Sequence, residues 1–158
     1  TEVRMTTQGK ILQRLEKLNQ PGANNDTPIT VLFPEEAIPV GHVWSEPHEV
    51  RLKLKEGGTK AVQTRRRFEL LSVRNGVAVI SVNFQVLTPL RDPALEAQLI
   101  QRLAKGELRF DVDAGRLISQ QLDVDRRLHD FSGPGSLMHY LSRFTEELTD
   151  GSSRLPDK

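Results

Sequence analysis

The four histidines are the residues of this chain best suited to acid–base chemistry or metal binding near neutral pH. His42 and His48 lie on either side of Trp44, and His129 and His139 flank a Gly-Pro-Gly turn across which they could approach each other. Structural zinc sites use ligand pairs separated by about two to five residues, usually with cysteines among them. Neither histidine pair has that spacing, and the chain has no cysteine. The sequence therefore predicts neither a metal site nor a cofactor.

No motif in the sequence supports nucleophilic catalysis. No serine stands in the Gly-x-Ser-x-Gly sequence of hydrolases, and Ser136 directly follows a turn that joins two expected strands. Two pairs of aspartates are each separated by one residue: Asp111 and Asp113, and Asp123 and Asp125. They lack the Asp-x-Asp-x-Asp-Gly pattern of a calcium loop, and residues two apart on a strand share its solvent face. We therefore expect no enzyme; a hydrolase-type enzyme using His129 or His139 with an aspartate is the remaining catalytic alternative.

The charge balance argues against nucleic acid and against an anionic membrane surface as partners. The 158 residues include 22 Lys and Arg and 21 Asp and Glu, a net charge of +1. Arg65, Arg66 and Arg67 form the one basic run, and alternation along a strand would send Arg66 to the face opposite its neighbours. One Trp, one Tyr and six Phe offer little to stack on bases. No apolar run approaches the roughly 18 residues of a transmembrane helix, so no transmembrane segment is expected.

Alternation of apolar and polar residues predicts that most of the chain forms half-buried β-strands. The clearest strand covers 77–87, and Asn75-Gly76 before it is typical of a type I′ hairpin turn. A hairpin is expected over 3–12. Further strands are expected around 50–54, 61–73, 108–112, 118–128 and 136–148, the last with a spacing that also allows a helix.

One helix is expected over 92–105. Asp92 is a good N-cap, Pro93 suits the first helical position, and leucines recur every fourth residue from Leu95, with Gly106 as the end. The segment 19–28 is rich in Pro, Gly and Asn and predicts a flexible loop, and 150–158 predicts a disordered tail.

These elements predict a mainly β protein of the β-rich α+β class. We expect a curved antiparallel sheet, half-barrel or sandwich, of about seven to nine strands with one helix near 92–105. The length suits a single domain over 1–158. Because the chain begins within a strand pattern and without Met, we expect it to be the C-terminal part of a longer chain, with any signal peptide or lipid-attachment segment preceding it.

The segment before the first long strand contains Phe33-Pro34, then Ile38-Pro39-Val40-Gly41 and then Trp44. It resembles the Leu-Pro-x-x-Pro-Val-x-x-Gly-Asp-x-Trp signature of an uncharacterised family of bacterial extracytoplasmic domains, with His42 in place of the Asp. The run from Gly106 through Phe110-Asp111 to Gly115-Arg116-Leu117 is similar to that family's Phe-Asp-x-x-x-Gly-x-Leu hairpin. The resemblance covers residues 29–148. It implies an antiparallel β fold and a periplasmic, lipoprotein-anchored or secreted location, and it supplies no catalytic residues.

Many amphipathic strands without a converging catalytic set favour a non-enzymatic extracytoplasmic binding or structural module. Such a module would contact a protein through its concave apolar face or through an exposed sheet edge. The alternative is a carrier or binder of a lipid or other apolar small molecule in a half-barrel cavity. The candidate ligand-binding residues are Trp44, Phe84, Phe110, Tyr140 and Phe144. For Trp44, which follows a stiff proline-containing loop, a role in the core is the simpler interpretation and a ligand platform the alternative.

Overall fold

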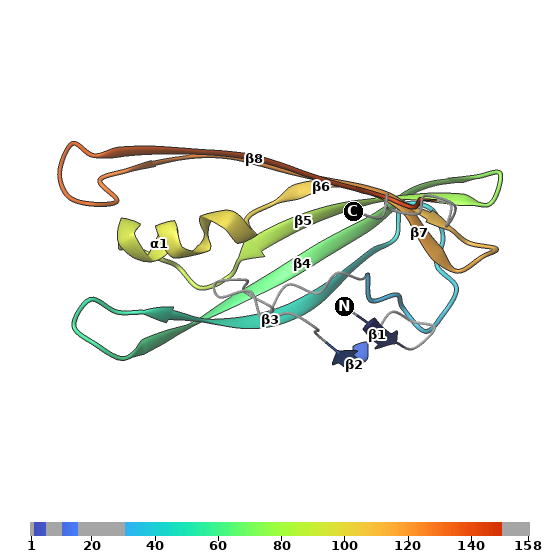
Figure 1. Ribbon diagram of the computed structural model, residues 1–158, viewed down its shortest axis with the longest axis horizontal. Helices are drawn as coiled ribbons and strands as arrows, with labels where there is room; N and C mark the ends of the chain where they lie inside the picture. Colours follow the sequence, from blue (N-terminus) through green and yellow to red (C-terminus); the bar gives the residue numbers. More distant parts are fainter. Residues whose placement is uncertain (1, 6–10, 16–30, 150–158) are drawn as a thin grey trace, which may run out of the picture. The chain divides into compact units, whose positions relative to one another are not determined.

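The computed structural model describes residues 2–5, 11–15 and 31–149, and the chain divides into two compact units, Thr1–Pro39 and Val40–Lys158 (Figure 1). In the first unit, β1 (Glu2–Met5) and β2 (Ile11–Leu15) pair antiparallel. This pairing confirms the hairpin expected near the N-terminus, although its turn lies outside the described residues.

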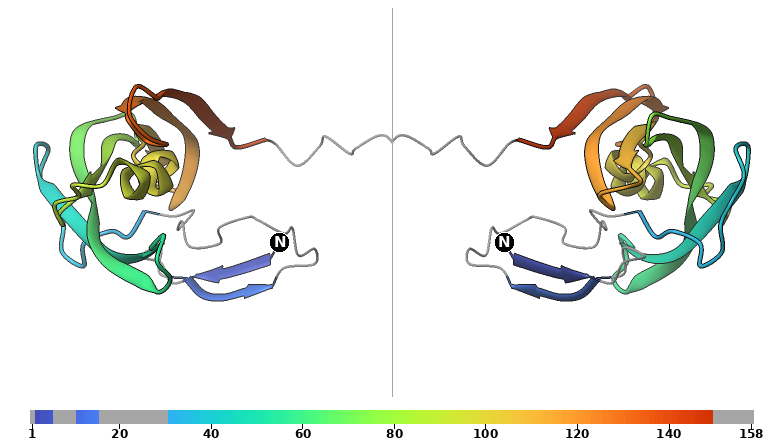
Figure 2. Two further views of the ribbon diagram at one scale, coloured as in Figure 1. Left: turned by 90° about the vertical axis from the view of Figure 1, so that its left-hand side faces the viewer. Right: turned by 90° about the vertical axis from the view of Figure 1, so that its right-hand side faces the viewer.

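The second unit contains one open antiparallel sheet in which each of six strands pairs with the next along the chain. The strands are β3 (Val43–Lys53), β4 (Thr59–Arg74), β5 (Val77–Val86), β6 (Lys105–Asp111), β7 (Arg116–His129) and β8 (Leu137–Glu147). β3 and β8 are the two edges, and Figure 2 shows the strands curling around the helix. The predicted mainly antiparallel β structure is confirmed. A sheet of seven to nine strands is not, because β1 and β2 form a separate two-stranded sheet.

The register of the six strands sorts their side chains onto two faces. One row of successive partners crosses the whole sheet: Trp44, Phe68, Val82, Gly106, Leu122 and Phe144. Residues in phase with this row form what we call the inner face, and the alternate residues form the outer face. The inner face carries the largest fully buried strand residues, Phe68, Ile80 and Val62. It is therefore the side of the sheet that forms the core.

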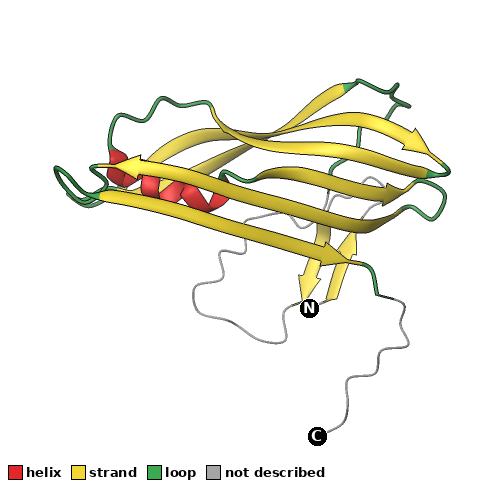
Figure 3. Ribbon diagram, turned by 90° about the horizontal axis from the view of Figure 1, so that it is seen from above, coloured by secondary structure: helices red, strands yellow, loops and turns green. Residues whose placement is uncertain are grey.

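The helix α1 (Pro93–Leu99) packs on the inner face (Figure 3). Leu95 and Leu99 are buried against Leu52 of β3 and Val62 of β4. The Asp92 side chain caps the helix by accepting a hydrogen bond of 2.9 Å from the N–H of Ala94. These contacts confirm the expected start of the helix and its apolar stripe.

The helix ends earlier than the expected residue 105. Its continuation, Ile100–Arg102, is a 3₁₀ turn, and β6 begins at Lys105. Gly106, expected to end the helix, lies inside β6 opposite Leu122. The physical reason is the extended backbone that sheet pairing requires, since Lys105 is the register partner of Asn83 in β5 and of Asp123 in β7. The carbonyl of Ala104 also accepts a hydrogen bond of 3.1 Å from the N–H of Phe84 in β5. Sheet pairing thus replaces the last expected helical turn.

Other parts of the sequence interpretation have mixed outcomes. The spacing over 136–148 allowed either a strand or a helix, and the segment forms a strand, β8. Residues 31–33, which precede Pro34, form no strand. The loop expected over 19–28 and the tail expected over 150–158 lie outside the described residues. Within the described ranges, no helix has the length and apolar character needed to cross a membrane.

Gly106 permits a close approach between β6 and β7. A Cβ atom on this residue would overlap the carbonyl oxygen of Gln121 and lie 3.0 Å from the Cα of Leu122. We expect Gly106→Ala to lower the free energy of unfolding by about 3 kcal/mol, measured by urea denaturation, because backbone atoms of β7 must move. The control is Gly58→Ala, where φ is +85° but nothing lies within 4 Å of the added carbon. The free energy of unfolding of this control should fall by only about 1 kcal/mol. Equal decreases in the two variants would contradict the role of Gly106 in the close approach of β6 and β7.

Candidate binding site on the inner face

A groove of about 450 Å³ lies between the end of β5, the helical segment and β7; we call it the inner groove. Its apolar lining consists of Phe84, Val86, Pro89, Leu90, Leu99 and Leu103. Its polar lining consists of Asn83, Gln85, Thr88, Glu96 and Arg126. The volume is typical of clefts that bind small molecules, and the lining mixes apolar side chains with polar and charged ones.

Hydrogen bonds to the backbone of neighbouring strands hold both walls of the inner groove to the sheet. The N–H groups of Leu87 and Thr88 donate to the carbonyl of Gln63 in β4 at 2.8 and 3.3 Å, and the Gln63 N–H donates to Oγ1 of Thr88 at 2.8 Å. On the helical side, the Gln98 side chain accepts from the N–H of Lys53 and donates to its carbonyl, each at 2.9 Å. Because both walls are tied to strands in this way, the groove is preformed.

Two charged side chains line the inner groove from different elements. Glu96 comes from the first turn of α1, and Arg126 comes from β7, directly opposite Tyr140 in β8. Neither Glu96 nor Arg126 forms an ion pair or a side-chain hydrogen bond with any residue that the structure describes. The groove therefore combines an apolar lining with one unpaired anion and one unpaired cation.

A buried ion pair adjoins the inner groove. Arg66 of β4 is 5% exposed, and its guanidinium binds the carboxylate of Glu46 in β3, with 3.1 Å between Nε and Oε2. The guanidinium carbon also lies 5.3 Å from the ring centroid of Phe68 and 6.0 Å from that of Phe84. Phe84 thus contacts the ion pair and also lines the groove. The expectation that Arg66 faces away from Arg65 and Arg67 is confirmed.

His48 extends this charged cluster along β3. Its Nε2 atom lies 3.5 Å from Oε1 of Glu46, is buried, and makes no hydrogen bond within the described part of the chain. The Glu46 carboxylate consequently has a guanidinium on one oxygen and an imidazole near the other. The inner face therefore contains a polar cluster of Glu46, His48 and Arg66 beside its apolar residues.

The five aromatic residues expected to bind a ligand all lie on the inner face, but only Phe84 lines the inner groove. Trp44 stacks on Phe68, with ring centroids 5.3 Å apart. Phe110 is opposite Ala78, towards the far end of β5. Tyr140 and Phe144 belong to the edge strand β8, where Phe144 is 51% exposed. The structure thus distributes these residues along the face instead of gathering them at one cavity.

The charged residues of the inner face are not among those predicted for a site, although the sequence contains a signal for one of them. Arg126 is in phase with Val124 and Leu128, so it interrupts an apolar face. Arg126 is nevertheless exposed, so its charge stays in contact with water although its side chain is in phase with core residues. Glu96 and Leu103 carry no comparable signal, since only the packing of the helical segment brings them to β5.

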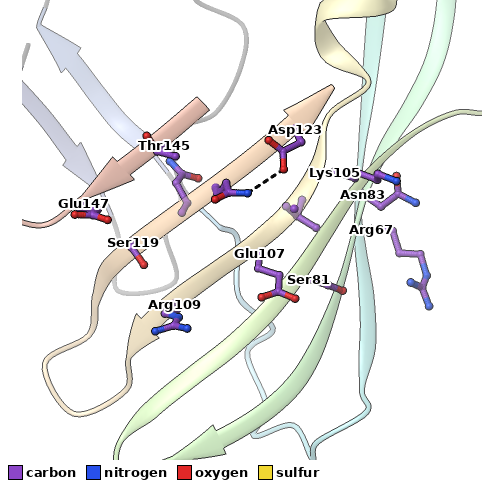
Figure 4. A pocket seen from close by; sticks show the side chains of 14 residues that line it. Arg67, Ser81, Asn83, Lys105, Glu107, Arg109, Ser119, Asp123, Thr145 and Glu147 are labelled. Carbon is purple, nitrogen blue, oxygen red and sulfur yellow. Dashed lines mark hydrogen bonds between the residues drawn. The ribbon is translucent and has the colours of Figure 1, made fainter. Parts of the chain in front are cut away.

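A larger groove of about 760 Å³ lies on the outer face, across β4 to β8 (Figure 4). Its charged lining contains three basic residues, Arg67, Lys105 and Arg109, and three acidic residues, Glu107, Asp123 and Glu147. Side chains there bind one another, as in the hydrogen bond of 2.9 Å from Nε2 of Gln121 to Oδ2 of Asp123. Because its charges cancel, this groove favours no ligand of a particular charge.

The histidine–aspartate pair of the catalytic alternative also lies on the outer face. His139 Nε2 is 2.8 Å from Oδ1 of Asp125, and both side chains are exposed. The Ser136 hydroxyl donates instead to the carbonyl of Gly133 at 2.7 Å, within the turn that precedes β8. Among the described residues, no three His, Asp or Glu side chains are grouped so as to hold a metal ion. His139 and Asp125 therefore pair across β7 and β8, and Ser136 is bound to Gly133 and not to His139.

Comparisons with models of protein families, with curated proteins and with solved structures found no match. The resemblance to a family of extracytoplasmic domains therefore stays a prediction. Function has to be inferred from the geometry of the inner face and of the sheet edges.

The buried Glu46–Arg66 pair should behave differently from an exposed pair. We expect Glu46→Ala to lower the free energy of unfolding by about 3 kcal/mol, because it removes the carboxylate from a buried guanidinium. The double variant Glu46→Leu/Arg66→Met should recover most of this loss, since it removes both charges. Glu49→Ala breaks an exposed ion pair with Arg51 on the same strand and should cost less than about 1 kcal/mol. Urea unfolding measures all three; a Glu46→Ala loss no larger than that of Glu49→Ala would refute the assignment.

The outer-face pairs between β7 and β8 should titrate at acid pH. The hydrogen bond of 2.7 Å from Nε of Arg143 to Oδ1 lowers the pKa of Asp123 below its ordinary 3.8, and the hydrogen bond with His139 lowers the pKa of Asp125. Because these pKa values are lower in the folded state, the pairs stabilise the fold above about pH 3.8, and the stabilisation is lost as the pH falls through the folded pKa.

Titration of the carboxyl carbons by NMR should therefore give a midpoint below 3.8 for Asp123. In Arg143→Gln the midpoint should return towards 3.8, because the main cause of the shift is removed. Arg127→Gln removes a charge from the same face without touching this hydrogen bond, and it serves as the control. A midpoint at or above 3.8 in the unaltered protein would show that the pairing does not hold in solution.

Proposed function

We propose that this protein is a non-enzymatic binding module that holds a small apolar or amphipathic molecule in the inner groove. The observation that carries the proposal is a preformed groove of about 450 Å³ on the inner face of an open sheet, in which six apolar side chains lie beside five polar or charged ones. Small-molecule sites are commonly clefts of this kind, with a few polar groups that orient the ligand. Binding of an apolar molecule also fits the extracytoplasmic location that the resemblance implies.

The exposure of the groove residues supports this proposal. Phe84, Val86, Leu90 and Leu103 all line the groove, yet each remains only half-buried. Covering apolar surface stabilises a complex by about 25 cal/mol for each Å² removed from water, before the cost of association. A ligand with an apolar body would cover this surface without any rearrangement of the strands.

A protein partner at the β8 edge is the second candidate. β8 is an edge strand of 11 residues, on which Leu141 is 72% exposed and Leu137 57% exposed. The opposite edge strand, β3, contains Pro47, which cannot donate a backbone hydrogen bond to an added strand. An edge without such protection is suited to pairing with an extended segment of a partner.

Fluorescence of the neutral apolar probe N-phenyl-1-naphthylamine tests the groove directly. We expect the probe to bind and Val86→Trp to weaken its affinity at least about tenfold, because the larger ring fills the space between β5 and the helical segment. Val79→Trp is the matched control, since Val79 is in the same strand but on the outer face.

The thermal unfolding midpoint of each variant shows whether it is folded. Absence of probe binding by the unaltered protein would rule out the proposal. Equal loss of affinity in Val86→Trp and Val79→Trp would show that the probe does not occupy the inner groove.

A further inference from the structure

We infer that the ligand of the inner groove is an anionic amphiphile, whose chain lies on the apolar lining and whose carboxylate or phosphate binds Arg126. This inference rests on the proposed function and adds the chemical class of the ligand. The juxtaposition that carries it is a guanidinium without a described partner beside the apolar side chains of the inner groove.

Arg126 stands apart from the other arginine of the inner face of this sheet. Arg66 is neutralised by Glu46, whereas no described carboxylate lies within ion-pairing distance of Arg126. Arg126 is also the one basic residue among the described residues that line the groove. A guanidinium binds planar anions through two parallel N–H···O hydrogen bonds, so it suits a carboxylate or a phosphate.

The acidic residue of the groove is better satisfied within the protein than the basic one. Glu96 lies in the first turn of α1, at the positive end of the helix dipole, which favours a negative charge. Arg126 lies on a strand, whose backbone offers no comparable field. The charge that the protein leaves uncompensated in the groove is therefore that of Arg126, and the complementary ligand is an anion.

The surroundings of Arg126 fit a ligand with one polar end. Val124 and Leu128 flank it on the same face of β7, and Tyr140 is its register partner in β8. Val124 is 4% exposed, so the chain of β7 beside the arginine is part of the core. Arg126 itself is exposed, which leaves its guanidinium accessible to a head group that remains near water.

The test compares amphiphiles that differ only in the head group, used below their micelle concentrations. The probes are dodecanoate, dodecyl phosphate, dodecanol and dodecyltrimethylammonium, each competing with bound N-phenyl-1-naphthylamine. We expect at least one of the two anions to bind about tenfold more tightly than dodecanol, as a charge-assisted hydrogen-bonded pair would provide. The ratio between dodecanoate and dodecyl phosphate identifies the preferred head group.

Arg126→Gln should abolish this preference, measured as the ratio of the affinities for the anions and for dodecanol in the same variant. Arg127→Gln is the matched control, because it removes the same charge one residue away on the outer face, and it should keep the preference. Raising the salt concentration should reduce the preference in the unaltered protein and have no effect in Arg126→Gln.

Each contrary result has a distinct meaning. Equal affinity for dodecanol and both anions would overturn the inference and leave the proposed function intact. An equal loss of the preference for an anion in Arg126→Gln and Arg127→Gln would have the same meaning. Tighter binding of dodecyltrimethylammonium would overturn it in favour of Glu96 as the head-group site. If N-phenyl-1-naphthylamine itself does not bind, both the proposed function and this inference fail.

Discussion

The apolar inner face of one open sheet is the constraint on which the rest of this structure depends. Six paired strands direct alternate side chains to that face, and these must be covered for the sheet to be stable. The cover described here is α1, a helix of 7 residues. A helix this short is unstable alone, so the burial of Leu95 and Leu99 against Leu52 and Val62 holds it in place. The inner groove is the space between this helical segment and the end of β5.

Charged groups on the inner face are handled in two different ways. Arg66 is buried and bound to Glu46, with its guanidinium near the rings of Phe68 and Phe84, so its charge is satisfied within the protein. Arg126 reaches the same face two strands beyond β5, but it has no described partner and remains exposed. A paired buried charge is satisfied within the fold, whereas the accessible charge beside the inner groove is the group that we propose binds a ligand. The two arginines therefore lie in different environments on one face of the sheet.

Local irregularities allow this sheet to curl without mixing its faces. The register shifts between Leu70 and Ser72 and again between Arg109 and Phe110, where an extra residue lets one strand bend against its neighbour. At Leu70 the shift turns Leu71 outward, where it is 40% exposed, and the residues after it continue the alternation. Gly106 contributes in another way, because only a residue without a side chain fits against the backbone of Gln121.

The sequence by itself determined the antiparallel strands, their two faces and several turns, because alternation and turn chemistry are local. The Asn75-Gly76 turn has positive φ at both residues, and Arg66 faces away from Arg65 and Arg67, as the pattern predicts. The end of α1, the place of Gly106 and the grouping of Phe84, Glu96 and Arg126 were decided only by the tertiary structure. The helix end depends on whether Ala104 pairs with β5, and the groove depends on residues that are distant along the chain. Such contacts arise from packing and register, which no local periodicity encodes.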